Sequence, residues 1–281
     1  MGSYTYFACA RIAGQWQNIG SVKSFSVSAQ STSTTPTAAV VPPVGAASGW
    51  SLSFSDEFNG TAVDTSKWLP QRFSWGDPYD QPFNASEGAS FSAKNVTVSN
   101  GAAVLTTKRE ASTAWGKSYT HTSGMLSSEG KFTLKRGDYI EARIWIPKSD
   151  GLWPAFWTVP SGQWPPEIDI FEFFDTAKQS QPKFNYHWGT SSNHQQLGPR
   201  TYGAAGVDYR NSWHTYGLHR TLDNRLVPYV DGVAYPAASV TSQDALPQFV
   251  ILNLSMYAGA NPSSTEQMKI DHVRAWSPKA S

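Results

Sequence analysis

Three carboxylates, Glu167, Asp169 and Glu172, fall within six consecutive residues whose other members are apolar. Successive side chains of a β-strand point to opposite faces, so Glu167 and Asp169 share a face, whereas Glu172 would point to the other side of a regular strand. A one-residue bulge at Ile170-Phe171 returns Glu172 to the acidic face, and bulges are over-represented beside active sites because they re-aim a side chain. The spacing therefore predicts three acids on one face of a bulged strand, with apolar side chains packed behind them.

Acids at this spacing suit glycoside hydrolysis, in which one carboxylate attacks the anomeric carbon and another protonates the leaving oxygen. With the bulge, Glu167 and Glu172 are separated by roughly 13 Å of strand. Leaning side chains bring their carboxyls toward the ~5–5.5 Å that double displacement requires. Charge on Glu167 raises the pKa of Glu172 and keeps it protonated as the acid. Once the sugar esterifies Glu167, Glu172 can act as a base toward water, while Asp169 hydrogen-bonds Glu167 and fixes its orientation.

Two other interpretations of the acidic run are open. A solvated charged face normally mixes signs, but no Lys or Arg occurs between Asp150 and Lys178. Acids at this spacing could instead hold calcium, although neither an EF-hand loop nor a histidine cluster accompanies them. Hydrolysis accounts best for three carboxylates that repel one another wherever solvent is partly excluded.

Strand patterns run through the chain from residue 50 onward. Between 139 and 146 apolar residues occupy every second position, which is the period of a half-buried strand. Residues 227–235 indicate a hairpin around an Asp-Gly turn at 231–232, since both central residues of that turn need positive φ. The near-continuous apolar run 248–254 is typical of a strand deep inside a sandwich. Long helical periodicity is missing, so the predicted fold is all-β, a single large β-sandwich.

The composition suits a neutral ligand. The 281 residues are 40% hydrophobic, carry a formal net charge of +1 and include 12 Trp, 12 Tyr and 14 Phe. This length can bury a full core without metals or disulfides, and the single cysteine, Cys9, provides no disulfide framework. Near-neutral charge argues against nucleic acid as a partner. Aromatic rings stack on the C–H faces of sugars, so a polyhydroxylated ligand is predicted.

Composition divides the chain into three parts. Residues 1–30 hold two short strand-like stretches, 4–7 and 25–28, and are expected to be a fragment of an upstream β module or an added tail. Residues 31–48 are rich in Ser, Thr, Pro and Ala and are predicted to be a linker, because they cannot bury enough apolar surface to order themselves. Residues 49–281 form the predicted catalytic domain. No export signal or membrane span is evident, so secretion is inferred from function alone.

The run Glu-Ile-Asp-Ile-Phe-Glu resembles the signature of family 16 of the glycoside hydrolases in its bulged form, as in laminarinases and agarases. Five further segments match that family in order, namely 54–60, 151–157, 213–216, 229–232 and 271–274. The resemblance covers about residues 50 to 278. It implies a jelly roll of two curved antiparallel sheets with an open concave cleft, and hydrolysis with net retention of anomeric configuration.

By motif position, Glu167 corresponds to the family nucleophile, Asp169 to its assisting acid and Glu172 to its acid/base. Trp153 and Trp157 fall where the family often has sugar-contacting tryptophans, with core packing as the alternative. His187 is expected beside the acids if its strand pairs with theirs, with a structural role as the alternative. The other candidates for substrate binding are Asn84 on the expected cleft rim, and Trp115 and Trp75 in probable loops. The segment Trp164-Pro165-Pro166 replaces the Gly-containing entry to the catalytic strand that is usual in the family.

The family frequently carries a structural calcium ion on the convex face, away from catalysis. Position in the chain suggests Glu57, the backbone of Gly101 and Asp271 as its ligands. One ion that clips both ends of the domain would stabilise the closed sandwich by mass action. No cofactor is expected for catalysis itself.

The leading functional prediction is a secreted, retaining endo-glycoside hydrolase that cleaves β-1,3 or mixed β-1,3-1,4 glucan. A β-galactan hydrolase of the agarase type is an alternative, because the same acids serve both enzymes and only side chains on the cleft rim determine which polysaccharide binds. A lectin-like, non-catalytic binding module is the alternative of another class, since this architecture also binds sugars without chemistry. The expected partner is a polysaccharide, with no nucleic acid or membrane, and the protein is expected to be a monomer.

Overall fold

The computed structural model describes residues 2–6, 9–12, 15–18, 23–27, 42, 47–72, 80–235, 245–262 and 264–279. The chain forms two compact units, Met1–Val41 and Pro42–Ser281. Most of the predicted linker, 31–48, lies outside the described residues, so the three predicted domain boundaries stay predictions.

The N-terminal unit contains four short strands. The predicted stretches 4–7 and 25–28 overlap β1 (Gly2–Tyr6) and β4 (Lys23–Val27), which pair with each other in antiparallel fashion. Between them, β2 (Cys9–Ile12) and β3 (Gln15–Asn18) form a second antiparallel pair that the sequence pattern did not indicate.

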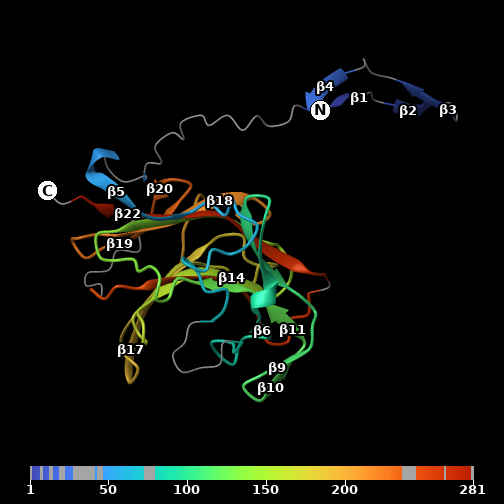
Figure 1. Ribbon diagram of the computed structural model, residues 1–281. Helices are drawn as coiled ribbons and strands as arrows, with labels where there is room; N and C mark the ends of the chain where they lie inside the picture. Colours follow the sequence, from blue (N-terminus) through green and yellow to red (C-terminus); the bar gives the residue numbers. More distant parts are fainter. Residues whose placement is uncertain are drawn as a thin grey trace. The chain divides into compact units, whose positions relative to one another are not determined.

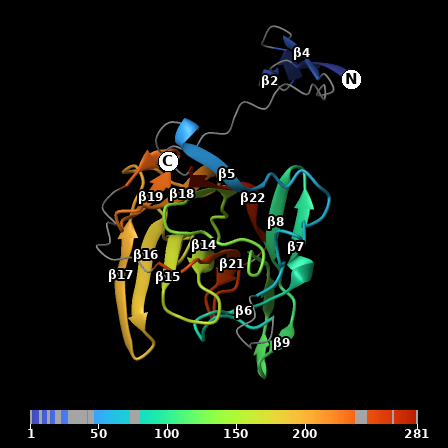
Figure 2. The ribbon, with the colours of Figure 1, turned by 60° about the vertical axis from the view of Figure 1, so that its left-hand side comes forward.

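The larger unit is built from two antiparallel sheets, which Figure 1 shows as stacked layers. The first sheet has six strands in the order β12 (Met125–Ser127), β21 (Phe249–Met256), β14 (Leu152–Val159), β15 (Glu167–Glu172), β16 (Lys183–Thr190) and β17 (Asn193–Thr201). Figure 2 shows β14 to β17 and β21 side by side. This sheet carries the acidic run on its fourth strand.

The second sheet has eight strands and forms the other layer of the sandwich. Its order is β20 (Val233–Ala234), β19 (Leu226–Val230), β18 (Trp213–Arg220), β13 (Tyr139–Trp145), β22 (Glu266–Pro278), β8 (Ala102–Thr107) and β7 (Val96–Ser99), and β5 (Trp50–Asp56) pairs with β22. Small elements complete the unit: a parallel pair of β6 (Ala89–Phe91) and β11 (His121–Ser123), the hairpin of β9 (Ser112–Ala114) and β10 (Lys117–Tyr119), and the 3₁₀ helices η1 (Ala47–Gly49) and η2 (Ala93–Asn95). The all-β sandwich predicted from strand periodicity is confirmed, and it is of the jelly-roll type.

The core fills the space between the two sheets. The alternating residues of β13, such as Ile140 and Ile144, are fully buried there against Ile168 of β15 and Leu252 of β21. All eight residues of β21 are buried, as its apolar run predicted. The predicted Asp-Gly hairpin joins β19 to β20, with φ of 49° at Asp231 and 78° at Gly232.

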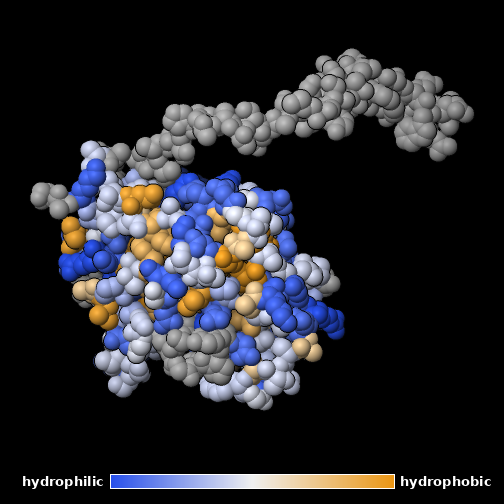
Figure 3. Space-filling view, viewed as in Figure 1, coloured by the Kyte–Doolittle hydropathy of each residue, from blue (hydrophilic) through white to orange (hydrophobic). Residues whose placement is uncertain are grey.

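The surface of this unit is mixed in character. On the face shown in Figure 3, apolar residues lie in small groups among hydrophilic ones. None of the helices in the described part of the chain has the length and apolar character to cross a membrane.

Candidate active site

The acidic strand β15 contains the predicted bulge. Opposite β14, Phe171 pairs with Phe156 and Asp169 pairs with Trp157, so Ile170 is an extra residue without a partner across the ladder. The register against β16 shifts over the same interval. A bulged residue leaves a main-chain group outside the ladder, and here the buried hydroxyl of Tyr202 donates to the carbonyl of Ile170 at 2.7 Å.

The bulge separates the strand into an acidic and an apolar face. Ile168, Ile170 and Phe171 are all fully buried in the main core, whereas Glu167, Asp169 and Glu172 line one pocket on the other side of the sheet. The three acids predicted to share a face therefore do so.

The carboxylate of Glu172 is held by two neighbours. Trp153 Nε1 on β14 donates to Glu172 Oε1 at 2.9 Å, and Asn185 Nδ2 on β16 donates to Glu172 Oε2 at 2.6 Å. Glu172 is 8% exposed and Asn185 is 2% exposed. The two flanking strands thus fix this side chain at the floor of the pocket.

Glu167 is held from the other end of the strand. Trp164 Nε1 donates to Glu167 Oε2 at 3.1 Å. His187, which pairs with Glu167 across β15 and β16, places Nε2 at 3.7 Å from Glu167 Oε1 and at 3.4 Å from Asp169 Oδ2. Its Nδ1 lies 2.8 Å from His194 Nε2, so one of these nitrogens carries the shared hydrogen.

Burial dominates the electrostatics of the acids. Burial, followed by the charge of Asp169, raises the pKa of Glu167 well above its usual range. Burial and the charge of Glu172 do the same to the pKa of Asp169. The pKa of Glu172 is also raised by burial, against the opposing effect of the Asn185 and Trp153 hydrogen bonds. The site therefore favours a state with fewer than three negative charges.

The pocket encloses about 430 Å³, part of it open to solvent. Besides the three acids, it is lined by Phe83, Asn84, Glu87, Trp153, Ala155, Trp157, Asn253 and Ser255. Buried Glu87 supports one wall, since its Oε1 accepts from the main-chain N–H groups of Phe83 and Asn84 at 2.6 and 3.0 Å. A pocket with several protonatable carboxyls, aromatic walls and amide groups can bind a sugar and exchange protons with it.

Residues 83–274 match the family described as Glycosyl hydrolases family 16. That match spans more than half of the chain and includes the bulged strand and every pocket residue. The chain belongs to this family.

Several known glucan-cleaving proteins are similar to the chain. The endo-1,3-1,4-beta-glycanases ExsH and EglC of Rhizobium meliloti (strain 1021) are 31% and 29% identical to the chain, over 81% and 80% of its length. These matches cover 52% of ExsH and 51% of EglC, so the chain spans about half the length of these relatives. The catalytic domain of an endo-1,3-beta-glucanase (laminarinase) from Thermotoga petrophila RKU-1 is similar with a TM-score of 0.68 and 26% identity, covering 82% of this chain and 99% of that one.

Among the residues expected from the family to contact substrate, Trp153 lies directly beside the acids. Its ring stacks on that of Tyr257 at 4.9 Å and packs near Phe174 at 5.7 Å. Burial and the charge of Glu172 raise the pKa of Tyr257 to about 12, so its hydroxyl stays protonated. Trp153, packed against these two rings, forms one wall of the pocket next to Glu172.

Trp157, Asn84 and His187 also reach the site. Trp157 donates its Nε1 hydrogen to Asn253 Oδ1 at 2.7 Å and packs against Phe83, so only 8% of it is exposed. Asn84 is exposed and lies on the pocket rim. His187 was expected beside the acids if its strand paired with theirs. β16 does pair with β15, and His187 lies opposite Glu167.

Trp115 is not a lining residue of the pocket. It lies in the turn between β9 and β10 with φ of 51° and is 72% exposed. Trp75 lies outside the described residues, so its predicted place on the cleft wall stays a prediction.

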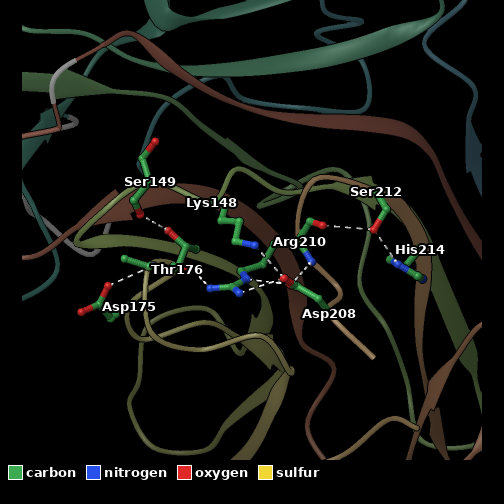
Figure 4. Close-up of polar contacts among 9 residues, drawn as sticks. Lys148, Ser149, Asp175, Thr176, Asp208, Arg210, Ser212 and His214 are labelled. Carbon is green, nitrogen blue, oxygen red and sulfur yellow. Dashed lines mark hydrogen bonds and ion pairs between the residues drawn. The ribbon is translucent and has the colours of Figure 1, made fainter. Parts of the chain in front are cut away.

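The loop after β15 is fastened by a polar network, shown in Figure 4. The Arg210 guanidinium donates to the carbonyl of Thr176 and pairs with Asp208 at 2.7 and 2.8 Å. Lys148 Nζ also contacts Asp208, at 3.0 Å, and the Thr176 hydroxyl donates to the carbonyl of Ser149. The Arg210 hydrogen bonds hold the pKa of Asp208 far below its usual range. Three loops are thereby joined.

The predicted calcium ligands lie on β22 or next to strands that pair with it, since Asp271 is in β22, Glu57 follows β5 and Gly101 precedes β8. The pairing of β8 with β22 ends at Ala103 and Ile270, and that of β5 begins at Asp56 and Val273. Glu57, Gly101 and Asp271 adjoin the interval between these two pairings.

The carboxylates of Glu57 and Asp271 already contact arginine side chains. Both oxygens of Glu57 accept hydrogen bonds from Arg274, at 2.8 and 2.6 Å. Asp271 Oδ2 lies 3.4 Å from Arg143. A calcium ion would compete with Arg274 for the same oxygens, so the Glu57 carboxylate does not fit as a ligand in this arrangement. Calcium binding by the protein stays a prediction.

One group in the described part of the chain has metal-ligand character. Glu167, Asp169 and His187 offer ligand atoms that all lie within 4.8 Å of one another. Two of these three residues are acids predicted to be catalytic, so the same contacts of His187 can also orient them in the pocket.

Two residues beside the acids were not predicted as site residues. Asn185 precedes His187 by two positions, so it shares the face of β16 that looks onto the acids. In the sequence, Trp164 stands out only as a departure from the usual family entry to β15. Its hydrogen bond to Glu167 depends on how the segment before β15 folds, which the sequence pattern does not show.

Glu167→Gln should raise thermal stability. Burial raises the folded-state pKa of Glu167, so its contribution to stability is largest below its unfolded pKa and is lost as pH rises through the folded pKa. Glutamine removes that penalty and keeps an oxygen for Trp164. We expect a Tm gain of about 2–4 °C near neutral pH, shrinking toward pH ~4, by calorimetry. A Tm gain that does not change with pH would contradict this origin.

Proposed function

We propose that the chain is a retaining endo-β-glucanase that cleaves β-1,3 or mixed β-1,3-1,4 linkages by double displacement. The observation that carries this proposal is the presence of Glu167 and Glu172 on one face of the bulged strand, with Asp169 between them, in a pocket with aromatic walls. Membership of family 16 and the similarity to endo-1,3-1,4-beta-glycanases support it.

In the first step, Glu167 attacks the anomeric carbon while Glu172 gives its proton to the departing oxygen. The Trp164 hydrogen bond orients Glu167, and His187 beside Glu167 and Asp169 offsets their charge. The charge of Glu167 then disappears in the ester. In the second step, Glu172 takes a proton from water, which attacks the same carbon, so two inversions give net retention.

The substrate class follows from the pocket and the relatives. The lining residues other than the three acids and Glu87 are aromatic or neutral, which suits an uncharged glucan better than a sulfated galactan. Both relatives named above act on 1,3-1,4 linkages by their names. A β-galactan of the agarose type would use the same acids, so the experiment must separate the two.

The test is incubation with laminarin, lichenan, agarose and carrageenan, with an assay of reducing ends and of product length. We expect reducing ends from laminarin or lichenan, with intermediate oligosaccharides early in the reaction, as endo cleavage requires. Proton NMR should show the β anomer first, before mutarotation. Activity on agarose alone would overturn the substrate assignment, and an α anomer formed first would overturn retention.

Polymeric glucan is the proposed partner, and the protein is proposed to act outside the cell. A long polysaccharide does not enter cells intact, so its hydrolase has to meet it externally. Detection of the protein in culture medium rather than in cell extracts tests this point.

A further inference from the structure

The two partners of Glu172 can only donate hydrogen bonds. The indole nitrogen of Trp153 and the amide nitrogen of Asn185 have no lone pair available to accept a proton. Each carboxylate oxygen of Glu172 therefore faces a group that stabilises its ionised form. A proton on Glu172 has to point away from both neighbours.

The orientation of the Asn185 amide is set by the next strand. Gln196 Nε2 on β17 donates to Asn185 Oδ1 at 3.2 Å, which turns the amino group of Asn185 toward Glu172. With the amide reversed, Asn185 Oδ1 would face Glu172 and could accept its proton. Asn185 is 2% exposed and Glu172 is 8% exposed, so water cannot readily replace the contact between them.

We propose that Asn185, oriented by Gln196, is a positioning residue that makes Glu172 easier to deprotonate and directs its proton toward the substrate. This inference rests on the proposed function, in which Glu172 alternates between acid and base. Asn185 favours the ionised form that Glu172 must reach after each proton donation. Its hydrogen bond opposes the effect of burial on the pKa of Glu172, and the charge of His187 on β16 acts in the same direction. The other titratable groups that interact with the charge of Glu172 are Glu167, Asp169 and Tyr257.

Loss of the Asn185 donor should raise the pKa of Glu172. Glu172 would hold its proton to higher pH, so the alkaline limb of the pH profile should move upward. Loss of a hydrogen bond to a charged group shifts the pKa of that group by about one unit or slightly more. The deglycosylation step needs ionised Glu172 and should slow, whereas KM should not rise, because Asn185 is buried and is not among the residues that line the pocket.

The experiment compares three variants of the full chain with the parent protein. Asn185→Leu should move the alkaline limb up by about one pH unit and lower kcat about tenfold at neutral pH. Gln196→Glu, at an exposed position, should reverse the Asn185 amide and move the limb in the same direction by about half a unit. Gln195→Leu is the matched control, because Gln195 lies on the opposite face of β17 and contacts Asn193.

An alkaline limb unchanged in both Asn185→Leu and Gln196→Glu would overturn the proposal, as would an equal shift in Gln195→Leu. A parent protein that releases no reducing ends would instead overturn the proposed function. Carbon-13 NMR of labelled glutamate carboxyls, assigned with Glu172→Gln, then reads the same pKa without turnover. A Glu172 pKa that is unaltered by Asn185→Leu in that titration would overturn the positioning role independently.

Discussion

Replacing Glu167 with glutamine should leave a folded protein that hydrolyses β-glucan about 10⁴-fold more slowly or worse. Glutamine has nearly the same shape and keeps an oxygen for the Trp164 hydrogen bond, so the pocket is preserved. It lacks the charge needed to attack the anomeric carbon. The measurement is kcat on laminarin or lichenan, together with calorimetric binding of an oligosaccharide, which should stay within a few-fold of the parent protein.

Chemical rescue separates a nucleophile from a residue that only supports the pocket. In Glu167→Ala, azide can enter the space left by the side chain and attack an activated aryl glycoside directly. The product should be a glycosyl azide of inverted configuration, because a single displacement replaces two. Asn84→Ala, on the pocket rim, is the control and should give no azide product. Turnover of Glu167→Gln within tenfold of the parent protein would remove Glu167 from the role of nucleophile.

The arrangement of the acids was predictable because strand alternation is a strong local rule. Glu167, Asp169 and Glu172 could share a face only if one residue bulged, and Ile170 is the residue without a partner. The position of His187 could be predicted only on the condition that β16 pairs with β15 in the register that places it opposite Glu167. Sandwich architecture followed from the same alternation in strands such as β13.

Contacts that depend on tertiary path were not predictable from one sequence. Asn185 and Gln196 meet only because β16 and β17 pair across a register shift between Phe184 and Tyr186. Trp115 illustrates the opposite case, because an aromatic residue in a probable loop gave no sign of whether the loop faces the cleft. Glu57 follows directly after β5, and its hydrogen bond with Arg274 became visible only in the structure.

Replacing Glu172 with alanine should slow hydrolysis of natural glucan by about 10³- to 10⁴-fold, with a much smaller loss of the first step on activated aryl glycosides. A sugar hydroxylate is a poor leaving group and needs the proton of Glu172. An aryl oxide departs with little protonic help. Deglycosylation should slow for both substrates, because water loses its base. A burst of phenol followed by a slow steady state, in rapid-mixing kinetics on the aryl substrate, is therefore expected.

The pH profile tests the same assignment through the coupling of the acids. Burial raises the pKa of both Glu167 and Glu172, so the alkaline limb of the parent enzyme, where the pair loses its last proton, should lie above the usual carboxyl range. In Glu172→Ala the proton donor is gone and the alkaline limb should disappear. Asn185→Leu keeps the carboxyl and should only displace that limb, which makes it the matched control. Equal loss on natural and activated substrates, with the alkaline limb intact, would make Glu172 a structural residue and His187 the next candidate for the proton donor.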